Sequence, residues 1–363
     1  MSENDSAKLN PINVTQEDVA RLAGVSRGIV SYVINNGPRS VAPETRERVL
    51  EAIAELGYRP NKHAQQLMRE QWGSVAERDF GLILPNVTLL QRPYYGTILA
   101  SIYQTVHDFH YRIRFIRFFD ELQNPALFNE LIHREEISGL ILMSLDQVIA
   151  SESDRQLVTQ IRERIDNVVC LEWQLDGLPS VSFDRTAAAY KATSHLIKLG
   201  YQDILYLGMG DERVKGFHQA RIENELPYTL NSVFFAHDLD SGYHEMGRIL
   251  AEKLTPRAIM AGSDEVAFGI LRQLREQNIA VPHDIALVSI DNVPMAAFAA
   301  PSLTTIDVPK IDMGRVAVEV LVNNGKGKVN SSIVNLLPAK LIVRESCGAL
   351  PSVRSLDSVS VRK

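Results

Sequence analysis

Polar side chains that could read the edges of base pairs gather on one face of a short helix expected near residue 30. The polar face of the segment RGIVSYVIN comprises Arg27, Gly28, Ser31, Tyr32 and Asn35. Aliphatic side chains at helical spacing occupy the opposite face. A guanidinium can form two hydrogen bonds to a guanine, and a tyrosine can contact a base through its ring or its hydroxyl. The segment therefore predicts contacts to a nucleic acid, made chiefly by Arg27 and Tyr32.

Three short helices are expected to position this polar face. Thr15 is placed to cap the first helix in a capping box with Asp18, and Gly24 ends that helix in a left-handed turn. The buried side of the first helix is expected to comprise Val19, Ala20, Leu22 and Ala23. Ser26 caps the second helix, so the pair forms a helix-turn-helix whose second helix can enter a major groove. A third helix from about Pro43 to Leu56 would close a small core over the other two.

This part of the chain resembles the LacI/GalR family of bacterial transcription regulators. The resemblance rests on the segments VTQEDVARLAGVS, ETRERVLEAIAELGYRPN and AQQL. It implies that Thr15 and Ser26 belong to the DNA-contacting set together with the polar face of the second helix. The alternative interpretation of the same pattern is a helical bundle with no role in DNA binding.

The resemblance also implies a hinge helix after the third helix. Asn61 can cap it, and Ala64 would let the hinge helices of two subunits approach closely. Leu67, in the segment AQQL, would enter the minor groove as a wedge that kinks the duplex. Alternatively, Leu67 packs against the effector domain of its own chain.

Composition limits the class of protein and its partners. The chain has 363 residues, of which 45% are hydrophobic and 23% charged, which is typical of a globular protein with more than one core. Its net charge of −6 argues against a nonspecific nucleic-acid binder. Two cysteines offer neither a disulfide framework nor a metal-binding spacing, and we predict no cofactor. The polar N-terminus and the lack of a long apolar stretch predict a cytoplasmic protein without a membrane anchor.

From residue 79 onward, short apolar strands alternate with amphipathic helices, which predicts parallel sheets with right-handed crossovers. The first set of strands is expected at Phe80–Leu84, Ile113–Phe118, Gly139–Met143 and Val168–Leu171. The second set is expected at Val181–Phe183, Ile204–Gly208, Val233–Ala236, Ala258–Ala261 and Ile285–Ile290. The predicted fold class is therefore α/β, and it resembles the two-lobed periplasmic-binding-protein fold of the family's effector domain.

The resemblance assigns domains and an oligomeric state. We expect a disordered tail at 1–13, a helix-turn-helix domain at 14–59, a hinge at 60–72, an effector-binding and dimerisation domain at 73–350 and a tail at 351–363. The chain would cross between the lobes near Trp173, Asp307 and Leu337, with a helix from Ile311 to Val322 returning to the first lobe and the last strands in the second. No leucine heptads occur in the C-terminal tail, so we expect a homodimer rather than a coiled-coil tetramer.

An effector cleft between the lobes is implied at the carboxyl ends of the strands. The effector-binding residues carried over from the family are Tyr94, Tyr95, Asp146, Arg213, Ser263 and Asp291. The two tyrosines would lie in a loop and stack on the ligand, or one of them packs the lobe instead. Arg213 would grip ligand oxygens, or it forms a salt bridge between the lobes. Asp291 would accept hydrogen bonds from hydroxyls or ring nitrogens, and Ser263 replaces the family's asparagine.

No enzyme signature holds along the chain. The segments LGMGDERVKG and NNGKGK lack the spacing of dinucleotide and phosphate loops, and His244-Glu245 is not a zinc motif. We therefore expect a non-enzymatic repressor that binds a near-palindromic operator as a dimer and responds to a sugar-like effector. One alternative is a ligand-independent regulator with a decayed cleft, suggested by Ser263 and Val308. The other is a sugar-handling enzyme or carrier, which rests on fold analogy alone.

Overall fold

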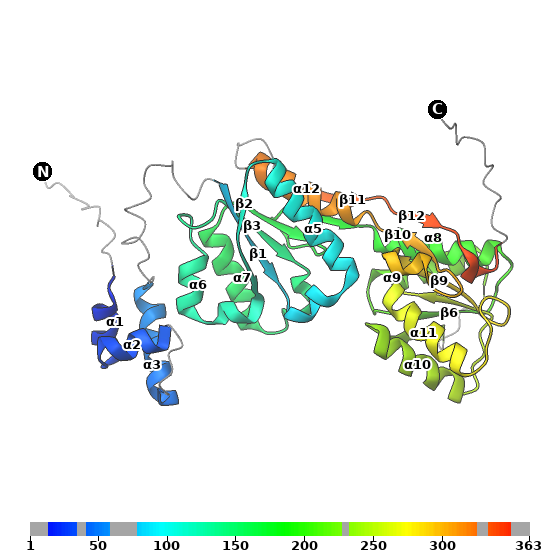
Figure 1. The fold of residues 1–363 in the computed structure, drawn as a ribbon, viewed down its shortest axis with the longest axis horizontal. Coiled ribbons are helices and arrows are strands. Elements are labelled where there is room, and N and C mark those ends of the chain that lie inside the picture. The colour runs from blue at the N-terminus through cyan, green and yellow to red at the C-terminus, as the bar shows by residue number, and fades with distance from the viewer. Residues whose placement is uncertain (1–13, 35–40, 59–77, 227–231, 325–332, 350–363) are drawn as a thin grey trace, which may run out of the picture. The chain divides into compact units, whose positions relative to one another are not determined.

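The structure is a computed structural model that describes residues 14–34, 41–58, 78–226, 232–324 and 333–349 (Figure 1). Several predictions on the sequence fall outside these residues and stay predictions. They concern the two tails, the hinge at 60–72 and four candidate DNA-contacting residues: Asn35, Asn61, Ala64 and Leu67.

The N-terminal helices form as the capping signals predict. They are α1 (Gln16–Ala23), α2 (Arg27–Ile34) and α3 (Pro43–Leu56). The capping box is present, because the Asp18 amide donates to Thr15 Oγ1 at 3.3 Å and the Thr15 amide donates to Asp18 Oδ2 at 2.9 Å. Gly24 adopts a left-handed conformation with φ 65°, which allows the tight turn between α1 and α2.

These helices share one small core, with a single error in its predicted members. The buried side chains include Val19, Ala20, Ala23, Val30, Val33, Val49, Ala52 and Ile53. The prediction that Leu22 faces inward is wrong, because 46% of it is exposed. The eight-residue helix buries only the narrow stripe of Val19, Ala20 and Ala23, and Leu22 projects beside that stripe.

Two compact units make up the chain. The first takes its described residues from 1–91, 102–181 and 314–334, and the second from 92–101, 182–313 and 335–363. The helices α5 (Pro93–Asp108) and α12 (Lys310–Asn324) begin in the second unit and end in the first. The chain thus passes between units close to the three predicted places, and residues 92–101 add an excursion that was not predicted.

One six-stranded sheet lies in the first unit, apart from its residues 182–183 and 335–337, which belong to the second. Its strands lie in the order β11 (Val334–Leu337), β5 (Ser180–Phe183), β4 (Val168–Leu171), β3 (Gly139–Met143), β1 (Asp79–Leu84) and β2 (Arg112–Phe118). The helices α6 (Pro125–Leu131) and α7 (Glu152–Arg164) pack on one face, where Phe128, Val158 and Ile161 meet Leu140 and Leu142. Two assignments to the other sheet are wrong: β5 pairs with β4, and β11 joins the same sheet. Sheet membership depends on partners, which the pattern of one strand does not encode.

The second unit contains another six-stranded sheet. Its strands lie in the order β12 (Lys340–Ile342), β10 (Thr304–Asp307), β9 (Ala286–Asp291), β8 (Ala258–Ala261), β6 (Ile204–Gly208) and β7 (Val233–Phe235). All the described pairs are parallel except the antiparallel pair of β12 with β10. The helix α8 (Arg185–Lys198) packs with α9 (Glu212–Glu223), and α10 (Leu239–Ala251) packs with α11 (Asp264–Glu276).

The strand order of the second sheet reverses at β6, and this creates a place for a ligand. The chain moves from β6 to β7 on one side and then to β8 on the other, so the loops after β6 and β8 diverge. At this point the backbones of Gly208 and Gly262 touch, since a Cβ on Gly208 would lie 2.6 Å from Gly262 Cα. Because neither glycine has a side chain, the ends of β6 and β8 approach closely before the two loops separate.

Candidate functional site

The polar face of α2 is accessible, as predicted. Ser26, Arg27 and Gly28 are exposed, whereas Ser31 and Tyr32 are half-buried. The Arg27 Nε donates to Gln16 Oε1 of α1 at 3.4 Å, and the Ile29 amide donates to Ser26 Oγ at 3.4 Å. The first bond holds the Arg27 side chain at the surface without burying it. Its guanidinium can therefore contact bases in the groove of a nucleic acid.

Most of the candidate effector residues meet within the second unit. Arg213 lies in the first turn of α9 after β6, Ser263 follows β8, and Asp291 is the last residue of β9. The prediction that Tyr94 and Tyr95 lie in a loop is wrong, because α5 begins at Pro93 and both rings belong to its first turn. The helical pattern of apolar residues predicts a start near Thr97. A proline favours the first position of a helix, so α5 begins four residues earlier, at Pro93.

Asp146 belongs to the first unit and is described with that unit. It lies in a short 3-10 helix, Leu145–Gln147, directly after β3, and it is exposed. Its place at the carboxyl end of a parallel strand agrees with the predicted kind of position, while its role as an effector contact stays a prediction.

Arg213 is buried, with only 8% of its surface exposed. Its Nη1 donates to the carbonyl of Gly262 at 3.0 Å, and its Nη2 lies 3.5 Å from Asp211 Oδ2. Asp211 also caps α9, since its Oδ1 accepts from the Arg213 amide at 3.0 Å. Within the described part of the chain, the Nε of Arg213 has no hydrogen-bond acceptor. A buried guanidinium donor without an acceptor is costly, so this atom marks a place for a ligand oxygen.

Asp291 is held in a strained and buried position. Its φ of 124° is rare for any residue other than glycine, and only 7% of it is exposed. Burial, together with the nearby Asp264, raises the pKa of the Asp291 carboxyl well above its usual range, although Arg213, Lys310 and Arg92 oppose the shift. The uncharged form of this carboxyl is therefore favoured, and that form can donate a hydrogen bond as well as accept one.

Asp264 and Ser263 hold the loops of the site together. The fully buried Asp264 accepts from Ser289 Oγ at 2.5 Å, Thr305 Oγ1 at 2.7 Å and the Val293 amide at 2.7 Å. Burial raises the pKa of Asp264 to about 6. Ser263 Oγ accepts from the Val266 amide at 3.3 Å and so caps α11.

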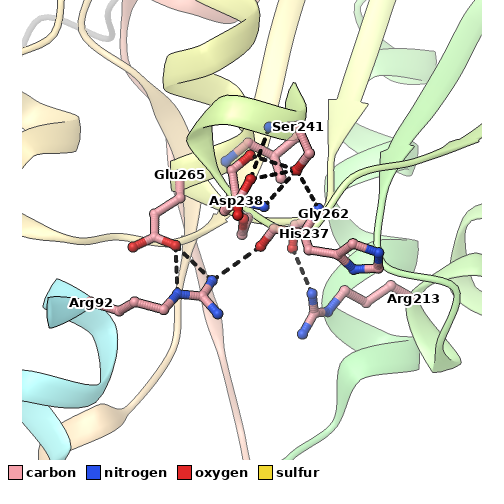
Figure 2. A network of polar contacts seen from close by, with 9 residues as sticks. Arg92, Arg213, His237, Asp238, Ser241, Gly262 and Glu265 are labelled. Atoms are coloured by element: carbon pink, nitrogen blue, oxygen red, sulfur yellow. Dashed lines mark hydrogen bonds and ion pairs between the residues drawn. The ribbon is translucent and has the colours of Figure 1, made fainter. Parts of the chain in front are cut away.

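Two cations that the sequence analysis did not single out lie beside these residues. Lys310, the first residue of α12, is 6% exposed, and its ammonium donates to the carbonyls of Asp291 and Val308. Arg92 Nε donates to Glu265 Oε2 at 2.7 Å, and its Nη2 donates to the carbonyl of His237 at 3.3 Å (Figure 2). Contacts with segments that are far apart in the sequence hold both cations in place. The one signal nearby was the position of Arg92, directly before the segment PYY.

The two tyrosines in the first turn of α5 each support one of these cations. The Lys310 ammonium lies 5.8 Å from the centre of the Tyr94 ring, and the Arg92 guanidinium lies 5.5 Å from the centre of the Tyr95 ring. The two rings meet edge to face at 5.0 Å, and each tyrosine is 6% exposed. The rings are thus engaged by cations and by each other. We call Arg92, Tyr94, Tyr95, Arg213, Asp291 and Lys310 the strand-end cluster.

Comparison with known proteins decides which family carries this arrangement. The model for bacterial regulatory proteins of the lacI family matches residues 15–61, and the model for a periplasmic binding protein-like domain matches residues 193–347. Catabolite control protein A of Priestia megaterium is 30% identical over 347 residues, which cover 92% of this chain and 99% of the relative. The chain belongs to the LacI family. As a member of it, the protein is a DNA-binding transcription regulator and not an enzyme.

Solved structures of LacI-family proteins have the same fold over most of the chain. The transcriptional regulator CelR in complex with cellobiose is 26% identical with a TM-score of 0.66, and it covers 92% of this chain and 99% of its own. The lac repressor dimer bound to operator and the anti-inducer ONPF has the same identity, TM-score and coverage. No group of His, Cys, Asp or Glu side chains suited to a metal ion occurs among the residues that the structure describes. Among the described helices, none has the length and apolarity needed to cross a membrane.

Proposed function

We propose that this LacI-family regulator is a cytoplasmic repressor that binds a near-palindromic operator as a homodimer and responds to a small-molecule effector. The observation that carries the DNA-binding part is the exposed polar face of α2 on a capped helix-turn-helix. The similar lac repressor structure is a dimer bound to operator, and the similar CelR structure contains cellobiose, so both kinds of partner occur on this fold.

The DNA-contacting residues are assigned from the family resemblance and, for those in α2, from the accessible face of that helix. Arg27 and Tyr32 read base edges, while Thr15, Ser26, Gly28, Ser31 and Asn35 approach the backbone or the bases around them. Asn61, Ala64 and Leu67 form the hinge contact, in which a leucine pair opens the minor groove at the operator centre. Gly28 carries no side chain, so it contributes through close approach of the helix to the duplex.

The effector is assigned to the strand-end cluster and Ser263, which belong to the second unit. Asp146, in the first unit, is assigned from the family resemblance alone. Arg213 and Asp291 are the principal contacts of the effector because both are buried at the carboxyl ends of parallel strands, where ligands bind in such sheets. Operator and effector binding are then linked by a single coupling free energy, typically ~1–3 kcal/mol.

Selection of duplex DNA from a random pool by the full-length protein tests this function. We expect enrichment of a sequence with two-fold symmetry, since two identical heads read two half-sites. A selection by the Arg27→Ala variant serves as the internal comparison and should recover a sequence with relaxed preference at one symmetric position. Recovery of asymmetric or unrelated sequences by the unchanged protein would contradict the proposal.

A further inference from the structure

The open donor of Arg213 indicates what kind of chemical group the effector presents. Arg213 as a whole is more than nine-tenths buried, and two of its guanidinium nitrogens face Gly262 and Asp211. Only its Nε lacks an acceptor within the described residues. This donor is therefore open to an oxygen of a ligand, and a charged oxygen forms the stronger hydrogen bond with a guanidinium.

Positive charge exceeds negative charge by one around Arg213 and Asp291, because the Asp291 carboxyl favours its uncharged form. The cations are Arg92, Arg185, Arg213 and Lys310, and the ionised carboxylates are Asp211, Glu265 and Asp264. Asp211 serves two guanidinium groups, since its Oδ2 lies 3.5 Å from Arg213 Nη2 and 3.9 Å from Arg185 Nε. The ammonium of Lys310 donates hydrogen bonds to the carbonyls of Asp291, Asn292 and Val308, which carry no net charge and do not cancel its own. Both arrangements leave a surplus that a ligand anion would neutralise.

The remaining members of the cluster do not oppose an anion. Arg92 is oriented by Glu265 of α11 and by the His237 carbonyl in the loop after β7, as Figure 2 shows. Burial and Asp264 raise the pKa of the Asp291 carboxyl, so that this group can stand beside an anion as an uncharged donor. A neutral hydroxyl of a ligand could accept from Arg213 Nε and from the uncharged Asp291 carboxyl, but it would leave the excess positive charge in place.

We propose that the effector of this regulator carries an anionic oxygen group, a carboxylate or a phosphate, that accepts from Arg213 Nε and lies among Arg92, Arg213 and Lys310. This inference rests on the effector site of the proposed function and adds the charge of the ligand to it. Neutral sugars are then poor effectors, whereas sugar acids or sugar phosphates of similar size bind.

Matched ligand pairs measured on the full-length protein test the inference. The pairs are D-gluconate with D-glucose and D-galacturonate with D-galactose, and D-glucose 6-phosphate forms the phosphate arm. Thermal unfolding and calorimetric titration at constant ionic strength report binding. We expect a saturable rise of the Tm with at least one acid and at least tenfold weaker binding of its neutral counterpart.

A pair of variants on one helix assigns the effect to the open donor. Arg213→Lys keeps a positive charge but removes the planar guanidinium, and it should weaken binding of the acid at least tenfold. Arg221→Lys is the matched control, because Arg221 is also buried on α9 but donates to the carbonyl of Ile204 at the start of β6. The control should bind the acid as the unchanged protein does. Operator binding by both variants verifies that they fold.

Three results would overturn the inference. The first is tighter binding of a neutral sugar than of its acid, the second is no saturable binding of any acid, and the third is equal acid binding by Arg213→Lys. A neutral compound that acts through Arg213 and changes operator affinity would leave the proposed function standing. Binding of an acid by a protein that binds no operator would support the inference and contradict the proposed function.

Discussion

Among the described residues, Asp291 combines a rare backbone conformation with a carboxyl whose pKa is raised well above its usual range. Its left-handed φ of 124° places the carboxyl at the end of β9, and Lys310 donates to its carbonyl. Lys310 thereby fixes a backbone conformation that only glycine adopts readily. The strained residue is also the one that the family resemblance assigns to the effector, which agrees with the tendency of backbone strain to occur at binding sites.

The buried carboxyls predict a specific dependence of stability on pH. The pKa of Asp291 is raised by burial and by Asp264, and the pKa of Asp264 is raised to about 6. A carboxyl of the unfolded chain titrates near pH 4, so above that pH the folded state retains protons that the unfolded state has lost. These groups therefore lower the free energy of unfolding as the pH rises from about 4 to about 6 and beyond.

The Asp291→Asn variant isolates this contribution. It cannot titrate, so relative to the unchanged protein it should gain stability as the pH rises from 4 to 7. Urea unfolding at several pH values measures the difference. A difference that stays constant with pH would show that Asp291 ionises normally in the folded chain.

Arg27 predicts a change in DNA specificity rather than in overall affinity. Arg27→Ala should cost ~1–3 kcal/mol at one base pair of each half-site and leave the other positions unchanged, because a fork to guanine is lost. Fluorescence anisotropy with operator variants measures the cost. Arg21→Ala, at a side chain on α1 that is 78% exposed, is the control and should change no base preference. A uniform loss over all sequences would assign Arg27 to the phosphates.

At the scale of elements, the capping box of α1 carries a measurable share of the stability of the head. Thr15→Ala removes the hydroxyl that accepts from the Asp18 amide, and we expect a loss of about 1 kcal/mol. Thr15→Ser retains the hydroxyl and should lose little. Chemical denaturation of the full chain, followed by a probe on the head, compares the two. Equal losses in both variants would mean that the methyl group, and not the cap, stabilises the helix.

Element boundaries were predictable where the local sequence determines them. The bounds of α3, β3, β4, β6 and β8 agree with the prediction, because each is a continuous apolar or periodic run between turn residues. β5 and β11 were assigned to the wrong sheet because a parallel strand gains its identity from a distant partner. β11 also shows exposed and half-buried residues throughout, so it lacks an apolar signal.

The candidate site was predictable only in part for the same reason. Arg213 and Asp291 follow apolar strands and match the family's pattern, so the sequence indicates them. Lys310 contacts the Asp291 carbonyl and the Tyr94 ring, about 20 to 220 residues away along the chain. Arg92 pairs with Glu265, which is 173 residues away. No spacing within one segment reports such a contact.

For the molecule as a whole, α5 and α12 connect the effector site to the rest of the chain. Both helices start in the second unit and end in the first, and Tyr94 and Lys310 lie in their first turns. Ser101 Oγ donates to the Ile311 carbonyl at 2.6 Å, which joins the two helices directly. A ligand that displaces Tyr94 or Lys310 therefore acts on both helices at once.

The proposed role of Leu67 in the hinge predicts a change in how the dimer bends its operator. Leu67→Ala should reduce DNA bending and operator affinity while nonspecific binding stays the same, because the wedge at the operator centre is lost. Energy transfer between dyes at the two ends of a selected operator measures the bend. Met68→Ala, at the adjacent position, is the matched comparison. Unchanged bending in Leu67→Ala would remove this residue from the wedge role.

Control of operator binding by the strand-end cluster is the central claim, and one titration tests it most directly. The affinity of the full-length protein for a selected operator is measured with and without each member of a metabolite panel, in parallel with Asp291→Ala. The account predicts a compound that changes the affinity of the unchanged protein about 5- to 150-fold, as a coupling of ~1–3 kcal/mol requires, and that has no effect on Asp291→Ala. An operator affinity that no compound changes, or a response that Asp291→Ala retains in full, would contradict it.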